Sequence, residues 1–230
     1  MKEELDIIYE DNHLLVVNKP PGMLVQGDVT GDLSLVDYAK NYIKKKYDKP
    51  GNVYIGLPHR IDRPTSGIVV LAKTSKALSR LNKQFSSRET EKSYWAIVKK
   101  PIPNDAAELI HYLKKNQKKN KSFAYDKAIP EAKKAILYYK QIAELKNYIG
   151  LSINLATGRH HQIRCQLATM GNPIKGDLKY GFPRSNPDGS IHLHAKAISL
   201  THPVKKEKMN FQAAVPDDVL WKEMEKQVHN

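Results

Sequence analysis

A polar loop that continues directly into an apolar segment places the strongest constraint on how this chain can fold. Residues 58–67 have the sequence PHRIDRPTSG, and residues 68–72 that follow are IVVLA. An apolar run of this length predicts a buried strand. The two prolines fix φ and keep the residues before them out of the helical region. We therefore expect a rigid, non-helical loop held against a core strand, presenting its side chains in one arrangement as a functional site requires.

One acidic residue, Asp62, lies in this loop between Arg60 and Arg63. Nearby positive charge favours the ionised form of a carboxyl group, so we expect Asp62 to be an anion at neutral pH. An anion suits a nucleophile or a base rather than a general acid. The residues alone leave a second interpretation open, in which Asp62 only forms a structural salt bridge with Arg60 or Arg63.

The composition is that of an ordinary globular protein of 230 residues, 40% hydrophobic and 27% charged. No repeat or linker divides the sequence, so we predict a single domain over residues 1–230. The only cysteine, Cys165, excludes an internal disulfide and any cysteine-based zinc site. We expect no membrane partner, because no apolar run approaches the roughly 20 residues that span a bilayer. With no signal peptide before the first predicted strand, the expected location is the cytoplasm.

The net charge of +14, from 38 basic and 24 acidic residues, predicts a polyanionic partner. Without a membrane feature, that partner is nucleic acid. Five lysines gather between two short predicted strands, residues 108–113 and 122–127: Lys114, Lys115, Lys118, Lys119 and Lys121. Such a basic hairpin tip could grip phosphates or could be a solvated loop, and the sequence leaves both open.

Strands outnumber helices in the predicted pattern. Strands are expected at residues 5–9, 13–17, 54–57, 68–72, 91–98, 132–142, 147–155, 191–195, 197–202 and 209–213. Helices are expected at residues 34–47, from 74 or 75 through about 85, from just after 158 to 170, and from 215 onward. The short, hairpin-like spacing predicts an α+β fold, with a mixed, mainly antiparallel sheet and a few flanking helices.

Three residues outside the loop are further candidates. Arg164 lies about 100 degrees around its predicted helix from the apolar Ile163, so it can lie at the helix edge and point into a cleft. Tyr94 shares one face of its predicted strand with Ala96 and Val98, and is either a core residue or part of a site. Lys19 ends a predicted strand beside a Pro-Pro-Gly bend, where it could reach a phosphate or have no role.

Two motifs together resemble those of one family. Residues 59–67, HRIDRPTSG, resemble the His-Arg-Leu-Asp-x-x-Thr-Ser-Gly signature of the RluA-type pseudouridine synthases, and residues 158–164, GRHHQIR, resemble their Gly-Arg-Thr/Ser-His-Gln-Ile/Leu-Arg signature. Similar strings occur at residues 18–22, 92–96, 173–177 and 193–195. The sequence departs from the family pattern at Ile61, where leucine is usual, at His160, where threonine or serine is common, and at Asn172, where histidine is common.

The resemblance implies an enzyme that isomerises uridine in structured RNA, tRNA or rRNA, to pseudouridine without a cofactor. Asp62 would be the essential carboxylate, which either attacks C1′ or removes the 2′-proton, and the sequence does not choose between the two. Tyr94 would stack on the uracil and Arg164 would pair with Asp62. Residues expected to contact RNA are His59, Arg60, Lys19, Arg159, His161 and Gln162. The partner would be RNA rather than DNA.

Many relatives carry an N-terminal S4 RNA-binding domain. Here the catalytic pattern begins by about Leu5, so we expect the catalytic domain alone, acting as a monomer. RNA binding would then depend on the basic surface of this domain.

The residues suggest two other functional classes. A metal-dependent hydrolase or nuclease could use His160, His161, His192 and His194, but no carboxylate pair accompanies them, and we predict no metal site. A non-catalytic RNA-binding or ribosome-assembly protein on the same fold would account for the charge. The intact set of Asp62, Tyr94 and Arg164 favours the enzyme, because a protein that only binds RNA does not need an ionised acid in an anion-binding cleft.

Overall fold

The computed structural model describes residues 5–229, and they form two compact units. The first unit consists of residues 5–91 and 195–214, and the second of residues 92–194 and 215–229. The interpretation of residues 1–230 as a single domain stays a prediction. Among the described residues, no helix is both long enough and apolar enough to cross a membrane.

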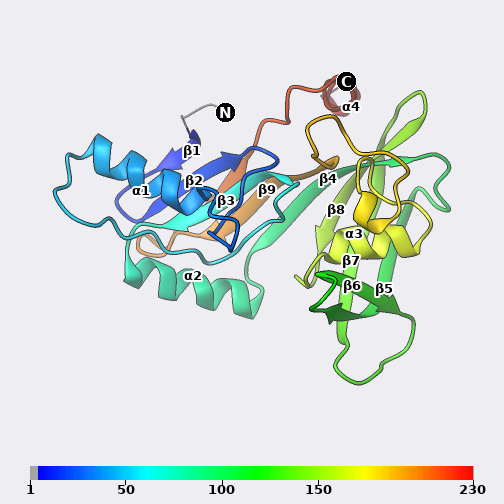
Figure 1. The fold of residues 1–230 in the computed structure, drawn as a ribbon, viewed down its shortest axis with the longest axis horizontal. Coiled ribbons are helices and arrows are strands. Elements are labelled where there is room, and N and C mark those ends of the chain that lie inside the picture. The colour runs from blue at the N-terminus through cyan, green and yellow to red at the C-terminus, as the bar shows by residue number, and fades with distance from the viewer. Residues whose placement is uncertain (1–4, 230) are drawn as a thin grey trace. The chain divides into compact units, whose positions relative to one another are not determined.

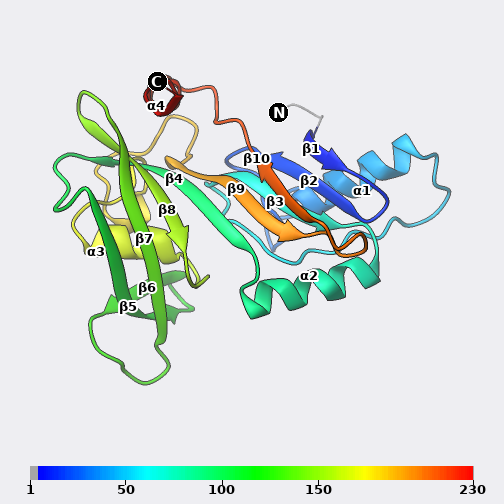
Figure 2. The same cartoon turned by 180° about the vertical axis from the view of Figure 1, so that it is seen from behind.

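The first unit contains five strands in the order β1-β2-β3-β9-β10 (Figures 1 and 2). Their bounds are β1 Asp6–Glu10, β2 Leu14–Lys19, β3 Ser66–Ala72, β9 Leu193–Thr201, which begins in the second unit, and β10 Lys208–Gln212. β1 with β2, β2 with β3, and β9 with β10 are antiparallel pairs. The strand predicted at residues 54–57 is wrong, since only Gly56 forms a bridge, with Ala72. Pro58, which follows, has no backbone N–H to extend the pairing.

Both faces of the sheet are buried around the continuous apolar segments 14–17 of β2 and 68–72 of β3. Alternate side chains of the two strands pack on α2 (Ser75–Ser87) together with β9 and β10. The intervening side chains, Leu15, Val17, Val69 and Leu71, are also fully buried. The second helix of this unit, α1 (Leu35–Lys46), buries Leu35, Ala39 and Ile43 and begins with a capping box between Ser34 and Asp37. The sequence therefore predicted these two helices correctly.

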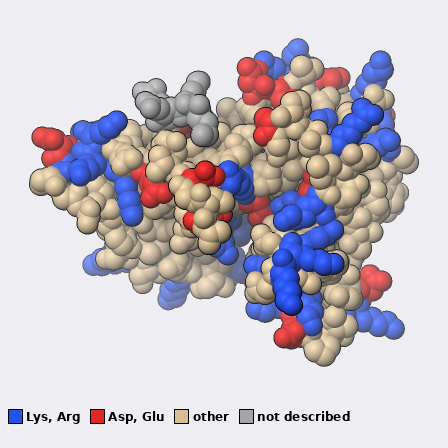
Figure 3. Space-filling model, in the orientation of Figure 1, with Lys and Arg blue, Asp and Glu red and all other residues tan. Residues whose placement is uncertain are grey.

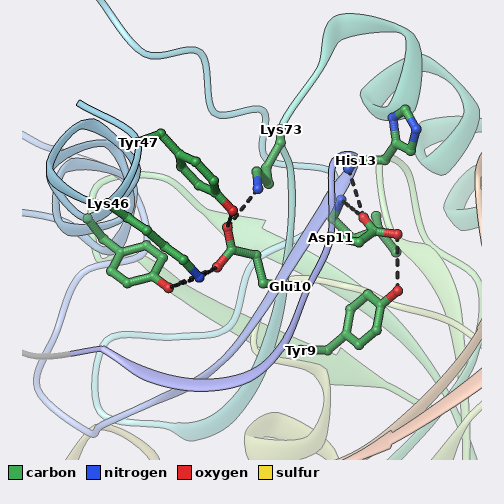
Figure 4. A network of polar contacts seen from close by, with 9 residues as sticks. Tyr9, Glu10, Asp11, His13, Lys46, Tyr47 and Lys73 are labelled. Carbon is green, nitrogen blue, oxygen red and sulfur yellow. Dashed lines mark hydrogen bonds and ion pairs between the residues drawn. The ribbon is translucent and has the colours of Figure 1, made fainter. Parts of the chain in front are cut away.

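Glu10, at the end of β1, ties the C-terminal end of α1 to the sheet (Figure 4). Its buried carboxylate forms ion pairs of 2.7 Å with both Lys46 and Lys73. Tyr42 and Tyr47 donate hydrogen bonds of 2.8 Å to the same carboxylate. Burial alone raises the pKa of Glu10, but these four hydrogen bonds outweigh it and lower that pKa to about 2.

Replacing Glu10 with glutamine should therefore destabilise the protein in a pH-dependent way. The stabilising effect of a carboxylate with a depressed pKa is complete above its unfolded value near 4.5 and is lost as the pH falls towards about 2. We expect Glu10→Gln to lower the free energy of unfolding by about 1–2 kcal/mol at pH 7 and to match the native protein near pH 2. Denaturant titrations across this range measure the difference. Glu91→Gln, which removes only an exposed ion pair with Lys208, is the control. A difference that stays constant with pH would contradict this role for the Glu10 charge.

The second unit contains a five-stranded sheet in the order β4-β8-β7-β5-β6 (Figure 2). The strands are β4 Glu91–Lys99, which begins in the first unit, β5 Ala106–Asn116, β6 Lys121–Tyr125, β7 Lys133–Glu144 and β8 Tyr148–Leu155. Every neighbouring pair is antiparallel. A helix, α3 (Gln162–Thr169), lies on one face of this sheet, and α4 (Val219–His229) packs against β4 and β7.

The two faces of β4 pack into different clusters. Ala96 and Val98 belong to the core beneath α3, and Tyr94 packs against that core. Trp95 and Ile97 pack on the other face with Trp221 and Met224 of α4. The predicted alternation along this strand is confirmed, and it places Tyr94 on the α3 face of the second unit.

Candidate active site

The loop that carries Asp62 is held to the rest of the first unit through the backbone of Arg63. The Arg63 carbonyl accepts hydrogen bonds from the Lys19 ammonium, at 3.2 Å, and from the Gly22 amide, at 2.8 Å. The amide of Thr65 donates to the Asp62 carbonyl at 3.0 Å, closing a turn around Asp62. Asp62 itself is half-buried. Fixed backbone on both sides of this carboxylate gives it the defined position that the prolines in the sequence predicted.

Lys19 has a different place from the one the sequence suggested. Its side chain is fully buried at the end of β2, and the ammonium donates to the carbonyls of Pro20, Met23 and Arg63. Burial lowers the pKa of Lys19 to about 7, partly opposed by the negative charge of Asp62. A buried ammonium with three carbonyl acceptors has no surface for a phosphate. The prediction of an RNA contact therefore does not fit this geometry, and Lys19 instead joins the Pro-Pro-Gly bend to the Asp62 loop.

The side-chain contacts of Arg63 are with residues other than the adjacent Asp62. It pairs with Asp32 at 2.7 Å and donates to the Gly22 carbonyl at 2.9 Å. Arg60 is exposed at the surface of the loop. Arg63 therefore closes the bend at Gly22 through its side chain as well as its carbonyl.

His59 and Gly67 fix the two ends of the loop. His59 accepts a hydrogen bond from the Val70 amide at 2.9 Å, and its ring stacks on Phe85 of α2 with centroids 4.6 Å apart. His59 is predicted to bind RNA, but these two contacts are with protein. Gly67 has φ of +110°, and a Cβ there would lie 2.4 Å from the Ala195 carbonyl oxygen. Only glycine allows β3 to start so close to β9.

Arg164, on α3, is held by two acidic oxygens within the second unit. Its Nε donates to Oδ2 of Asp177 at 2.7 Å, and its Nη2 donates to Oδ1 at 2.9 Å. Both side chains are almost completely buried, at 5% and 1% exposed. The guanidinium also lies over the ring of Tyr180, 5.1 Å from its centroid. Such a planar, two-point contact fixes the orientation of the guanidinium as well as its position.

Asp177 and Tyr180 were not recognised as site residues from the sequence. Asp177 precedes the short 3-10 helix η1 (Leu178–Tyr180) and follows α3 by several residues of loop. Residues 173–177 resemble a motif of the family. That resemblance does not indicate which side chain pairs with Asp177. The pairing with Arg164 depends on how this loop folds back on α3.

The turn before α3 is built by Gln162 and Thr157. The amide oxygen of Gln162 accepts from the Thr157 hydroxyl and the Arg159 amide, and its amide nitrogen donates to the Ile136 carbonyl. Gln162 is 3% exposed, so its predicted RNA contact does not fit this geometry either. Arg159 is partly exposed and donates to the Lys134 carbonyl.

His160 and His161 stack on each other, with ring centroids 3.8 Å apart, and both are partly exposed. His160 contacts Ser122 and Asn120 on the β5–β6 hairpin, and His161 contacts the Tyr180 hydroxyl at 3.0 Å. The histidine that replaces the common threonine or serine at 160 therefore connects the basic hairpin to the start of α3. Asn172, the other departure, donates to the carbonyls of Lys99 and Pro101.

The histidines of the metal hypothesis have protein partners. His192 contacts Asn186 through Nδ1 and Asp218 through Nε2, and the ring of His194 lies 6.0 Å from that of Trp221. Within residues 5–229, no three His, Cys, Asp or Glu side chains are grouped as metal ligands would be.

The structure thus assigns Asp62, His59, Arg60 and Lys19 to the first unit, and Tyr94, Arg164, Arg159, His161 and Gln162 to the second. In the first unit, the carboxylate loop and its buried lysine are brought together. In the second, Arg164 is brought together with Asp177 and Tyr180.

Two solved structures share this fold. The human protein RNA pseudouridylate synthase domain containing 4 superposes with a TM-score of 0.77 at 22% identity, covering 97% of this chain and 92% of that one. The human protein RNA pseudouridylate synthase domain containing 1 gives a TM-score of 0.75 at 22% identity, covering 96% and 88%. The predicted α+β fold with a mainly antiparallel sheet is confirmed, and it is the fold of pseudouridylate synthase domains.

Sequence comparison identifies the family. Residues 13–169 match the family model described as RNA pseudouridylate synthase, a range that includes Asp62, Tyr94 and Arg164. The chain is 35% identical over 212 residues to the dual-specificity RNA pseudouridine synthase RluA of Haemophilus influenzae, covering 91% of this chain and 92% of that protein. It is 31% identical over 232 residues to ribosomal large subunit pseudouridine synthase D of Yersinia pestis, covering 94% and 69%.

The chain belongs to the RluA-type RNA pseudouridine synthases. It is therefore an isomerase that converts uridine in RNA to pseudouridine.

Proposed function

We propose that Asp62 is the carboxylate that carries out this isomerisation, acting on a uridine flipped out of its stack. The observation that carries the proposal is the fixed turn at Asp62, secured through the carbonyls of Asp62 and Arg63. A half-buried carboxylate held in this fixed position can attack C1′ or remove the 2′-proton. In either route the N1–C1′ bond breaks, the uracil turns, C5 bonds to C1′, and the proton on C5 leaves.

In the same proposal, Tyr94 and Arg164 complete the site. The ring of Tyr94 stacks on the uracil, and Arg164 pairs with the carboxylate of Asp62. The bidentate contact with Asp177 supports this role for Arg164, because it leaves the guanidinium in one orientation. The exposed Arg60 lies beside the extruded nucleotide, where it can occupy the space that the base vacates.

We propose tRNA or rRNA as the substrate, since relatives are named for ribosomal large-subunit and dual-specificity activity. The test is to map pseudouridine in all tRNAs and rRNAs from cells with and without this gene. The expected result is one or a few positions that lose the modification. Purified protein should restore the modification in RNA from the deletion strain. If neither measurement yields pseudouridine, the proposal of tRNA or rRNA as the substrate is wrong.

The basic hairpin is proposed as a phosphate contact. Figure 3 shows Lys and Arg side chains gathered over β6 and α3. Lys115, Lys118 and Lys119 are exposed near the turn between β5 and β6. Lys114 instead pairs with Glu131 at 2.6 Å. The contacts of His160 with Ser122 and Asn120 hold this hairpin against the start of α3.

Neutralising the three exposed lysines, as Lys115→Gln, Lys118→Gln and Lys119→Gln together, should weaken RNA binding and reduce its salt dependence. Each lost phosphate contact is expected to lower the slope of log K against log salt by about 0.7–0.9. The control removes the same charge from exposed lysines of the first unit, as Lys44→Gln, Lys45→Gln and Lys49→Gln. Equal slopes for the two triple variants would show that the hairpin contributes only its share of the net charge.

A further inference from the structure

One face of the sheet in the second unit is left uncovered over β5, β6 and β7. Helix α3 lies against the opposite face, where alternate residues such as Leu113, Ala135 and Leu137 are buried (Figures 1 and 2). On the uncovered face, four large apolar side chains are 38–48% exposed: Ile110, Phe123, Tyr125 and Tyr138. Exposed aromatic residues that gather on one face of a sheet, rather than being scattered singly, are typical of a binding surface.

The strand register makes these side chains neighbours. Tyr125 on β6 is paired with Tyr112 on β5, which is paired in turn with Lys134 on β7. Phe123 on β6 is paired with Lys114 on β5. Directly paired residues have their Cβ atoms about 5 Å apart, so aromatic and lysine side chains are neighbours across three strands.

Further pairs on the same face of the sheet extend from β7 to β8. Tyr138 on β7 is paired with Glu108 on β5 and with Asn154 on β8, and two residues further along β7, Lys140 is paired with Ser152. The hydroxyl of Tyr138 is hydrogen-bonded to Glu108, which raises the pKa of Tyr138. The uncovered face thus carries rings, lysines and uncharged polar groups, with few acids.

The charges on this face favour an anionic partner. Its acids are already engaged, because Glu131 pairs with Lys114 and Glu108 binds Tyr138. Lys134 and Lys140 are exposed, and within the described part of the chain neither takes part in an ion pair. Aromatic rings beside lysines suit a single-stranded nucleic acid, whose bases stack on the rings while its phosphates meet the cations.

We propose that this uncovered face binds an unpaired segment of the substrate RNA. It would be an accessory site for the substrate RNA, separate from the loop of Asp62, and it rests on RNA being the substrate. Stacking on a ring tolerates any base, so the site would add affinity without choosing the uridine. It would supply RNA-binding surface within the same chain that carries the catalytic loop.

The test measures binding of a fluorescent oligocytidine of about 12 nucleotides, within the range of single-strand sites. Oligocytidine has no uridine to isomerise, so its binding does not depend on the chemistry assigned to Asp62. Phe123→Ala, Tyr125→Ala and Tyr138→Ala together should weaken binding by at least about tenfold. Tyr54→Ala, which removes a ring of similar exposure from the first unit, should leave it unchanged. Unchanged affinity of the triple variant would overturn the proposal.

A second pair of variants keeps the test informative if the triple variant folds poorly. Lys134→Gln with Lys140→Gln should reduce the salt slope of oligocytidine binding, whereas Lys44→Gln with Lys45→Gln should not. On an RNA substrate with unpaired flanks, the aromatic variants should raise KM and leave kcat unchanged. Asp62→Asn should retain oligocytidine affinity, so failure of the catalytic assignment is distinguishable from failure of this one. If sedimentation shows a dimer that the aromatic variants dissociate, the face binds a second copy of the chain and the proposal is wrong.

Discussion

Asp62→Asn is expected to abolish pseudouridine formation while leaving RNA affinity nearly intact. Asparagine has almost the same shape but carries no negative charge, so it can act neither as a nucleophile nor as a base. Loss of a general base alone costs roughly 10²–10⁴-fold in rate, and loss of a nucleophile costs more. Single-turnover assays on a substrate RNA measure the chemical step, and filter binding measures affinity in the same preparations.

The matched control is Asp32→Asn, which removes an exposed carboxylate from the same unit and breaks its ion pair with Arg63. That variant should keep most of the activity, because it leaves the Lys19 and Gly22 contacts of the loop in place. If Asp62→Asn retains the native rate, the assignment of this residue is wrong. If it also loses RNA affinity, the carboxylate has a structural role that the proposal does not include.

Asp177→Ala is expected to have the largest effect on stability. The substitution removes both charge-assisted hydrogen bonds that Asp177 makes with the buried Arg164. Breaking a buried ion pair by removing one partner typically costs about 3–5 kcal/mol. Denaturant unfolding should therefore show a midpoint well below that of the native protein. Asp217→Ala, which breaks an exposed ion pair with Lys222, should scarcely move the midpoint.

Asp177→Asn separates orientation from stability. Asparagine can accept only one of the two hydrogen bonds through its amide oxygen, so the guanidinium loses its two-point contact. If Arg164 acts on the reacting carboxylate, this variant should lower kcat with little change in KM, at temperatures where it remains folded. A folded Asp177→Asn variant with native kcat would mean that the orientation of Arg164 does not limit the reaction.

Periodicity and capping predicted much of the fold. The alternation of Tyr94, Ala96 and Val98 is confirmed by their packing beneath α3, and α1 occupies most of the segment 34–47 predicted as a helix. These signals are local, because each depends on residues within a few positions of one another. The prediction of a strand at residues 54–57 was wrong because a strand must pair with a neighbouring strand. Only Gly56 forms such a bridge.

The site was harder to predict because its contacts join distant parts of the sequence. A lysine before a Pro-Pro-Gly bend looks exposed, but the carbonyls that bind Lys19 come from both the bend and the Asp62 loop, 44 residues further along the chain. Gln162 likewise has its partners on β7 and in the preceding turn. In both cases, hydrogen bonds to distant residues allow a polar side chain to be buried. No local sequence pattern predicts those hydrogen bonds.

The path of the chain has a consequence for how this protein is made. The chain passes from one unit to the other after Glu91, His194 and Ala214, and β9, which lies beside β3, comes from the last third of the sequence. During synthesis on a ribosome, nearly the whole of the second unit is therefore translated before β9 and β10 can complete the sheet of the first unit. Any premature stop before β9 leaves β3 with an open, apolar edge, the kind of surface on which nascent chains aggregate. Completion of the N-terminal sheet is thus a late event, governed by translation of the C-terminal segment.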